Sequence, residues 1–394
     1  WSAGVRWNIY NEKFMKTHGW FENLAVRANI GTVGNQNFQL SQIMTLYNFL
    51  KMYDGVMGAE IMSIANPELK WQTTLNRNIG LEFSLLQGLV NLDFNYYSNI
   101  TKNNLTDIAI LPSTGFSTYK ANMGKVRNQG YEFSLSITPI KKNGWIVNAF
   151  VNGAHNKNKL LNISDALRDY NEVIKENQTA HLNYAGYTQL ERIFLFEEGQ
   201  SLNSIFAVRS MGIDPGTGQE IFVTADGVQT FQWNAADQVV VGNTEPTLKG
   251  YFGLNVDYKR WSFGANFQYS FGADRYNKTL YEKIEGGNFA QNADRRALTQ
   301  RWTKPGDVAK YRGYGNTSQL KPTSRFVQKD DFLSMTSARL SYTLNANDLQ
   351  ALGISLLKFT LSTNDLFYVS TIKQERGLSY PFARTFYFSL QANF

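Results

Sequence analysis

Apolar and polar residues alternate one by one in segment after segment of this chain. The segment "WSFGANFQYSF" (261–271) puts Trp261, Phe263 and Phe267 on one parity, and Ser262 and Asn266 on the other. The same pattern recurs in "LKGYFGLNVDY" (248–258), "YEFSLSI" (131–137) and "RTFYFSLQANF" (384–394). Successive side chains of a β-strand point to opposite faces. The alternation therefore predicts strands with one apolar face and one polar face.

The composition limits the kinds of fold to which those strands can belong. Of 394 residues, 43% are hydrophobic and 14% aromatic, yet the mean hydropathy is only −0.35. A membrane-spanning helix needs about 20 consecutive apolar residues, and no run in the sequence approaches that length. The other structure that pairs every backbone group inside a bilayer is a closed β-barrel. A soluble sandwich, whose inner faces also alternate, is the alternative.

The lengths of the connections favour the barrel. Short joins such as "LLQG" (85–88) and "PIKKNG" (139–144) alternate with long ones near 32–70, 101–125 and 273–330. Outer-membrane barrels have short periplasmic turns and long extracellular loops. Strand directions alternate consistently only if 157–245 is one large extracellular loop, whose pieces "SIFAVRSMGI" and "QEIFVT" form local hairpins. The eleven predicted strands lie near 1–10, 23–32, 72–85, 88–100, 129–139, 144–156, 247–259, 260–272, 331–345, 353–366 and 383–394.

Eleven is an odd number of strands. In an alternating series the first and last strands then run in the same direction, whereas antiparallel barrels usually close with an even number. We therefore expect the chain to be a single, incomplete barrel domain (1–394), the C-terminal part of a larger polypeptide that supplies the remaining strands.

Several stretches resemble the SusC/RagA family of TonB-dependent outer-membrane transporters. The best match is "LPSTGFSTYKANMGKVRNQGYEFSLS" (111–136), which is similar to a family block with a Leu-Pro-x-x-x-Gly loop before a Gly-x-x-x-Asn-x-Gly-x-Glu strand. The other similar stretches, in family order, are "GTVGNQ" (31–36), "NPELKW" (66–71), "GIDPGTG" (212–218), "VGNTEPTLKGYFGLNVDYKRWSF" (241–263), "DFLSMTSARLSYTL" (331–344), "STNDLF" (362–367) and "YPFARTFYFSLQANF" (380–394).

The resemblance implies the C-terminal half of a 22-stranded barrel in the outer membrane of a Gram-negative, Bacteroidota-type cell. It implies import of oligosaccharides or peptides, with a SusD-like lipoprotein as a surface lid and energy supplied through TonB. The plug domain and the TonB-binding segment would lie elsewhere in the same polypeptide. Lipid and lipopolysaccharide of the outer membrane would surround the barrel. Whether two such transporter–lipoprotein pairs associate as a dimer stays open, as does the choice between glycan and peptide.

The sequence carries no signature of covalent chemistry. It has no cysteine, no G-x-S-x-G elbow and no Walker-type loop. Its three histidines, His18, His155 and His181, are scattered without the spacing of a metal site. "GIDPGTG" reads as a tight turn. We therefore expect no enzyme activity, no metal and no cofactor. The net charge of +7 is spread out, so no nucleic-acid partner is expected.

Three groups of residues are candidates for function. Aromatic residues in loops are suited to stacking on sugars or anchoring peptides and a lid, although they could equally pack on one another: Tyr184, Tyr187, Phe194, Phe196, Trp233, Tyr311 and Tyr314. Charges on the polar parity would face the lumen, where they could also pair across strands: Glu82, Asp93, Glu132 and Arg339. By the resemblance, the terminal aromatic strand is the signal for outer-membrane assembly: Phe386, Phe388 and Phe394.

Two other classes of outer-membrane protein would show the same alternation of apolar and polar residues. A passive porin or a surface adhesin would also be a barrel, but it would need neither a plug nor strands from elsewhere. An outer-membrane hydrolase would need a catalytic cluster at the rim, which the histidines do not supply.

Overall fold

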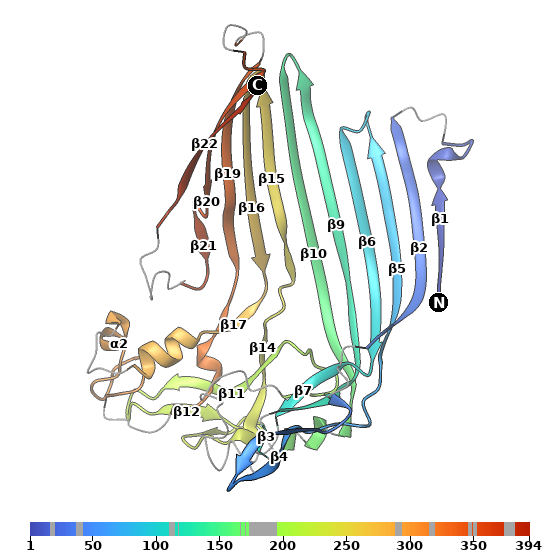
Figure 1. The fold of residues 1–394 in the computed structure, drawn as a ribbon. Helices are drawn as coiled ribbons and strands as arrows, with labels where there is room; N and C mark the ends of the chain where they lie inside the picture. Colours follow the sequence, from blue (N-terminus) through green and yellow to red (C-terminus); the bar gives the residue numbers. More distant parts are fainter. Residues whose placement is uncertain are drawn as a thin grey trace.

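Eleven long strands form one continuous antiparallel sheet in the computed structural model (Figure 1). Their order in the sheet is their order along the chain, as hairpin-by-hairpin alternation predicts. The strands are β1 (Ser2–Asn8), β2 (Phe21–Asn35), β5 (Gln72–Leu85), β6 (Val90–Lys102), β9 (Gly124–Lys142), β10 (Trp145–Ile163), β15 (Leu248–Tyr258), β16 (Trp261–Phe271), β19 (Phe332–Asn345), β20 (Leu356–Asn364) and β22 (Phe386–Asn393). All eleven predicted strands are confirmed.

The structure describes the chain apart from residues 16–19, 37–41, 110–114, 117, 166, 170, 173–194, 288–293, 315–319, 346–348, 350–352 and 374–382. In the described part, no helix has the length and apolar character to cross a membrane.

The two faces of the sheet differ in chemistry. On one face, polar side chains bond across neighbouring strands: the Asn78 amide donates to Asn29 at 2.8 Å, and the Asn266 amide donates to Ser337 at 3.0 Å. We call this the inner face. The opposite parity, which we call the outer face, carries large apolar side chains, among them Ile79, Phe263 and Phe388, that stay exposed. This is the division expected of strands between a lumen and lipid.

Aromatic rings mark both ends of the outer face. At the short-turn end they run across four strands: Trp145 stacks on Tyr258 at 4.1 Å between ring centroids, and Trp261 contacts Tyr342 at 4.7 Å. Tyr258 and Trp261 are register partners, so the row is continuous. A second row of rings lies toward the other end, where Tyr269 contacts Phe271 at 5.6 Å and Phe252 at 6.2 Å between centroids. From Trp261 to Tyr269 a strand rises about 27 Å at 3.4 Å per residue. With the usual barrel tilt, the two rows stand about 21 Å apart, close to the height of a barrel's apolar band.

β1 and β22 form the two edges of the sheet, which this chain does not close into a barrel. β22 pairs with β20 from Leu356↔Asn393 to Thr363↔Phe386. Phe386, Phe388 and Phe394, the predicted assembly signal, are largely exposed. Their outward parity is the one predicted for lipid contact; their part in assembly stays a prediction.

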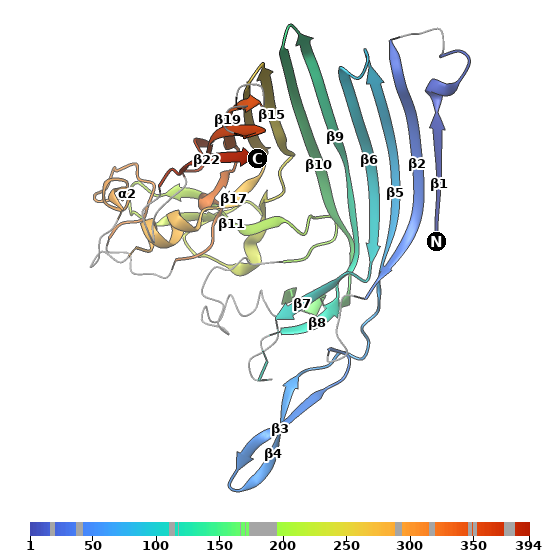
Figure 2. The same ribbon diagram turned by 45° about the horizontal axis from the view of Figure 1, so that its top comes forward.

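Small sheets and short helices fill the long connections (Figures 1 and 2). One projecting hairpin comprises β3 (Leu46–Tyr53) and β4 (Val56–Ser63), and another β7 (Leu105–Ala109) and β8 (Thr118–Asn122). Between β10 and β15 lies a four-stranded sheet in the order β13-β12-β11-β14. Its strands are β11 (Ser204–Ile213), β12 (Glu220–Val223), β13 (Gln229–Thr230) and β14 (Gln238–Asn243). The pieces "SIFAVRSMGI" and "QEIFVT", predicted to form local hairpins, are β11 and β12, and they pair with each other.

The connection from β16 to β19 carries β17 (Asp274–Tyr276), the π-helix η5 (Thr279–Glu285), α2 (Arg295–Thr299), the 3-10 turn η6 (Ser324–Phe326) and β18 (Val327–Lys329). Two further 3-10 turns are η1 (Ile9–Asn11) and η4 (Ala235–Asp237). A short strand, β21 (Tyr368–Ser370), pairs with β19 beyond the end of β20. Neither β21 nor the β3–β4 and β7–β8 hairpins were predicted.

β9 and β10 are longer than predicted. β9 begins at Gly124 rather than 129, and β10 continues to Ile163 rather than ending at 156. The extra pairs bury Val126 and Leu160 in a small core with Ile163 and Leu167. The polar residues of 157–163 suggest a loop, but this apolar cluster lets the ladder continue.

Candidate functional site

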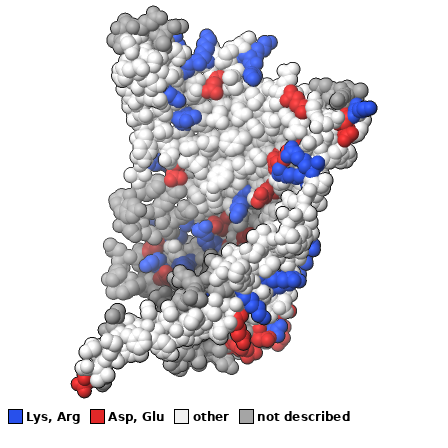
Figure 3. Space-filling model, turned by 45° about the vertical axis from the view of Figure 1, so that its right-hand side comes forward, with Lys and Arg blue, Asp and Glu red and all other residues white. Residues whose placement is uncertain are grey.

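A network of ion pairs lies on the inner face near the β1 edge. Glu82 on β5 accepts from Arg6 on β1 at 2.7 Å and also from Arg27 on β2. The second guanidinium nitrogen of Arg27 donates to Asp93 on β6 at 3.1 Å and to Asn95 at 2.6 Å. In Figure 3, acidic and basic side chains mix at mid-height on the right, and much of the surrounding surface is neither. The network joins four strands and balances its own charge.

Gly80 makes this network possible. In the sheet register Gly80 stands between Arg27 and Asn95, on the same row. A Cβ added there would lie 2.5 Å from Arg27 Nε and 2.6 Å from Asn95 Oδ1. Because Gly80 on β5 has no side chain, the Arg27 side chain can pass over it and reach Asp93 and Asn95 on β6. Gly80 and Asn95 were not predicted, because only the register between strands reveals their positions.

The four predicted lumen charges differ in their partners. Glu82 and Asp93 belong to the network. Glu132 stands in the register row of Asn95 and Ala154, and Arg339 in the row of Gly264 and Ser362. Neither Glu132 nor Arg339 makes an ion pair within the described part of the chain. Both charges are therefore available to a solute on the inner face.

A second, buried network organises the connection regions. The Arg325 guanidinium binds the Glu220 carboxylate through two bonds, of 3.1 and 2.9 Å, and the Glu285 carboxylate through bonds of 2.5 and 2.9 Å. Glu285 also accepts from Arg312 at 2.9 Å, and Glu220 from Thr323 at 2.8 Å. The side chain of Glu285 is fully buried and that of Glu220 is 5% exposed. The network joins β12, η5 and η6.

Aromatic rings enclose this network. Phe326 packs edge-on against Tyr281 at 5.1 Å between centroids and tilts against Tyr276 at 5.9 Å. Burial raises the pKa of Tyr276 and of Tyr281 above the ordinary tyrosine value, because the phenolate form would lose its hydration. Both phenols therefore stay protonated at any physiological pH, and the cluster is a structural core.

The predicted loop aromatics separate into packed and accessible residues. Phe196 packs on the Leu160 cluster, and Asn171 bonds both its backbone groups, at 2.7 and 3.0 Å. Tyr311 is buried against Ile284 and Ala297. These two are held by the fold rather than presented to solvent. Three further candidates, Tyr184, Tyr187 and Phe194, lie outside the described residues.

Trp233 and Tyr314 remain accessible in part. The Trp233 indole N–H donates to the Pro322 carbonyl at 3.2 Å, and the Lys321 ammonium lies 5.0 Å from its ring centroid. Tyr314 is 45% exposed, and the Arg301 guanidinium lies 5.3 Å from its ring. Each ring is thus fixed by a cation on one face, a contact worth about 0.5–1 kcal/mol at exposed sites.

"GIDPGTG" is a tight turn, as predicted. The Asp214 carboxylate accepts from the Thr217 backbone N–H at 2.9 Å and from its hydroxyl at 2.6 Å. That hydroxyl bond lowers the pKa of Asp214. The turn also seats Trp302, whose indole donates to the Pro215 carbonyl at 2.8 Å. A Cβ on Gly218 would lie 2.5 Å from the Trp302 ring. Among the described residues, no group of three or more possible metal ligands occurs.

Comparison with known proteins shows which proteins this chain resembles. The family described as TonB dependent receptor-like, beta-barrel matches residues 1–189. Across most of the chain, the TonB-dependent receptor P39 of Formosa agariphila is 28% identical over 400 residues. The chain is similar to TonB-dependent receptors over most of its length, and the family model matches its first 189 residues.

The match to P39 covers 92% of this chain but only 38% of the receptor. The TonB-dependent receptor SusC of Bacteroides thetaiotaomicron is 24% identical over 312 residues, which cover 74% of this chain and 30% of SusC. The chain thus spans well under half the length of the receptors it resembles.

A solved structure shares the fold. The RagAB peptide transporter superposes with a TM-score of 0.77 at 24% identity, covering 94% of this chain and 40% of the transporter chain. The predicted fold class, a large antiparallel barrel-type sheet of about eleven strands, is confirmed, although this chain alone does not close it.

Proposed function

We propose that this chain is the wall of an energised outer-membrane importer. The observation that carries the proposal is the contrast between the two faces of one sheet. The inner face bears the Arg6–Glu82–Arg27–Asp93 network, and also Glu132 and Arg339, which make no ion pair with any described residue. The outer face bears two rows of aromatic rings about 21 Å apart, with apolar residues between them.

The charge-balanced network suits a transport path rather than a reaction centre. Its carboxylates are satisfied by arginines, so they are poorly placed to act as general acids or bases. A lumen wall with paired charges presents hydrogen-bonding groups without a strong field of one sign. Similarity to a family of receptors agrees with a protein that binds and moves its ligand without covalent chemistry.

We further propose a SusD-like lipoprotein as lid and an oligosaccharide or peptide fragment as cargo. The similarity to SusC and to the RagAB fold supports the pairing. The tip regions of the long connections, with Trp233 and Tyr314 partly exposed, supply ring surfaces for a sugar, a peptide or the lid. TonB and a plug would act through the rest of the receptor, in the outer membrane.

Uptake by the full receptor tests the proposal. Cells that carry the receptor and its lipoprotein are offered labelled peptides and oligosaccharides, with and without TonB. We expect uptake of one class, abolished when TonB is absent. Swelling of liposomes that contain the intact receptor is the companion assay. Free permeation of small sugars, independent of TonB, would instead establish a passive porin.

A further inference from the structure

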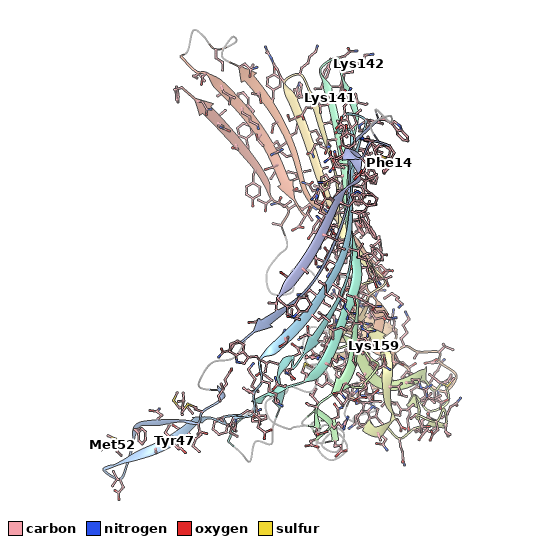
Figure 4. All side chains as sticks on the ribbon, turned by 90° about the vertical axis from the view of Figure 1, so that its right-hand side faces the viewer. Phe14, Tyr47, Met52, Lys141, Lys142 and Lys159 are labelled. Atoms are coloured by element: carbon pink, nitrogen blue, oxygen red, sulfur yellow. The ribbon has the colours of Figure 1, made fainter. Side chains whose placement is uncertain are left out.

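Six basic side chains gather on the outer face at the long-loop end of four adjacent strands. They are Arg77 on β5, Lys102 on β6, Lys125 and Arg127 on β9, and Lys157 and Lys159 on β10. We call them the outer basic patch. Figure 4 shows Lys159 of β10 toward one end of the sheet, and Lys141 and Lys142 of β9 at the other.

The bonds of neighbouring residues fix the outward direction of these side chains. Asn156 and Asn158 on β10 bond inner-face partners, namely Glu245 and Asn128. Thr101 shares a bond with Thr74, and Asn78 donates to Asn29. Because successive residues of a strand alternate, the basic residues between these inward ones point outward. Burial agrees on β10, where Lys157 and Lys159 are exposed while Asn158 and Leu160 are buried.

The patch contains like charges placed directly opposite one another. Lys102 is the register partner of Lys125, and Arg127 is the register partner of Lys159. Cross-strand pairs of like charge destabilise a sheet. None of the six basic side chains makes an ion pair or a side-chain hydrogen bond within the described residues. Because no described residue neutralises these basic side chains, we infer that an anionic group from outside the protein does so.

No acidic residue of these strands relieves the repulsion. β5, β6, β9 and β10 contain three acidic residues, Glu82, Asp93 and Glu132, and all three lie on the inner face. Two acidic groups of the flanking connections are engaged already. Asp107 pairs with Lys120 at 3.0 Å, and Glu198 accepts from Arg168 at 3.3 Å and from the Ile163 backbone at 3.2 Å.

The patch begins where the apolar band ends. Tyr96, Tyr131 and His155 lie across β6, β9 and β10 on the outer face, with Tyr131 and His155 in ring contact at 5.1 Å. Every member of the patch on these three strands lies beyond that row, on the side away from the short turns. Tyrosines favour the level of the lipid headgroups. The basic side chains therefore stand at the charged layer just above the hydrocarbon.

An apolar groove runs from the patch into the band. It has a volume of about 570 Å³ and lies between β1 and β6, with Ala28 and Ile79 in its lining, Tyr96 on one side and Arg77 at its patch end. Small residues form much of its lining, so a hydrocarbon chain can lie close to the sheet. A headgroup held at Arg77 would continue directly into this groove.

We propose that the outer basic patch binds the phosphate groups of a glycolipid in the outer leaflet, with one acyl chain in the groove beside Arg77. Lysine and arginine clusters next to a bilayer attract anionic headgroups, and arginine binds phosphate through paired bonds. The patch covers four strands, about 14 Å across, and roughly 13 Å along them. It is wide enough for more than one phosphate. The inference rests on the proposed outer-membrane orientation, but not on any substrate.

Retention of lipid A by the full receptor tests the proposal. The receptor is placed in nanodiscs of phosphatidylcholine with bis-phosphorylated lipid A or with the same glycolipid after removal of its phosphates, and retained lipid is counted by native mass spectrometry. The test variant is Arg127→Gln/Lys159→Gln. The matched control is Lys141→Gln/Lys142→Gln, which removes the same charge from the opposite end of β9.

We expect the receptor to retain phosphorylated lipid A in preference to the dephosphorylated form. Each basic residue near a bilayer contributes roughly a fivefold preference for anionic lipid, so the test variant should retain it about 25-fold less tightly, and the control should be unchanged. Equal retention by the test variant, or equal retention of the two glycolipids, would overturn the proposal.

Two further arms separate other sources of the counter-charge. If inorganic phosphate at millimolar concentration displaces the lipid completely, the patch is a phosphate site and not a glycolipid site. If the test variant loses its lipoprotein partner while lipid retention stays intact, the patch is a protein contact. Uptake measured in parallel distinguishes a failure of this proposal from a failure of the import function, because lipid retention does not require transport.

Discussion

Replacing Arg325 with methionine should destabilise the connection region while leaving the barrel sheet intact. Methionine keeps most of the volume but removes the guanidinium that binds both Glu220 and Glu285. Glu285 would keep its bond from Arg312, and Glu220 its bond from Thr323. Glu220, with a side chain only 5% exposed, would be left without a cation.

The size of the effect follows from burial. Breaking a buried ion pair by removing one partner costs about 3–5 kcal/mol, because a buried charge stays uncompensated. A surface arginine gives the comparison. Arg168 pairs with Asp165 and Glu198, and its side chain is 52% exposed, so Arg168→Met should cost about 0–1 kcal/mol. The difference between the two variants isolates burial as the cause.

The carboxylate left behind should also make the variant sensitive to pH. A buried carboxyl without a cation has a raised folded-state pKa, since burial disfavours its charged form. Stability of Arg325→Met should therefore increase as the pH falls from 8 toward 5, and decrease as the pH rises. The second substitution Glu220→Gln should recover part of the loss and remove this pH dependence.

Hydrogen exchange measured by segment is the suitable assay. In the full receptor, amides of β11–β14 and η5 should exchange faster in Arg325→Met, while β9 and β10 keep their protection. The reasoning would be refuted by unchanged protection over 204–243 and 279–285, or by a loss that Arg168→Met reproduces.

Three other changes test separate parts of the structure. Gly80→Ala should displace Arg27 and weaken its bonds to Asp93 and Asn95, at about 1–2 kcal/mol; denaturant unfolding should detect it, and Gly4→Ala, where a Cβ meets nothing closer than 3.5 Å, is the control. Asp226→Cys, in the large connection, should react with an impermeant maleimide on intact cells and Lys142→Cys should not; the reverse labelling would invert the proposed orientation. Replacing Phe394 with serine should lower the amount of receptor assembled in the outer membrane several-fold, whereas Asn393→Ser should not, and equal amounts in membrane fractions would remove the terminal aromatic from the assembly signal.

The alternation of residues was sufficient to predict the sheet but not its details. Strands such as β15 and β16 have strict period-two patterns and short turns, so their bounds follow closely from the sequence. β10 was predicted too short because its last residues are mostly polar, and the pairing of Leu160 with Val126 that extends it lies across strands. The β3–β4 hairpin was missed because apolar residues on both parities, such as Leu46, Tyr47 and Met52, remain exposed.

The site was only partly predictable for the same reason. Glu82 and Asp93 were predicted to share one face of the sheet and they do, since parity alone sets the face; that this face lines a lumen stays a prediction. Their partners Arg6 and Arg27, and the space that Gly80 provides, depend on how four strands align. Phe196 and Tyr311 illustrate the opposite error. Aromatic residues amid polar loops suggest a binding surface, yet both side chains pack into small cores that only the folded connections create.

The contacts that bring together the two ends of the connection between β10 and β15 have a consequence for the order of folding. β15 must find β10 across residues 164–247, whereas β15 and β16 are joined by a tight turn. For a flexible segment, that difference in length costs about 3 kcal/mol of loop-closure free energy. Here β11 and β14 pair from Ser204↔Asn243 onward, and Asn158 holds the Leu202 N–H at 2.8 Å. If this small sheet forms first, it brings the two ends of the segment together. β15 can then pair with β10 over a short effective distance, and the following strands can add to the sheet one hairpin at a time. Folding of the sheet would therefore be faster than the length of the connection suggests.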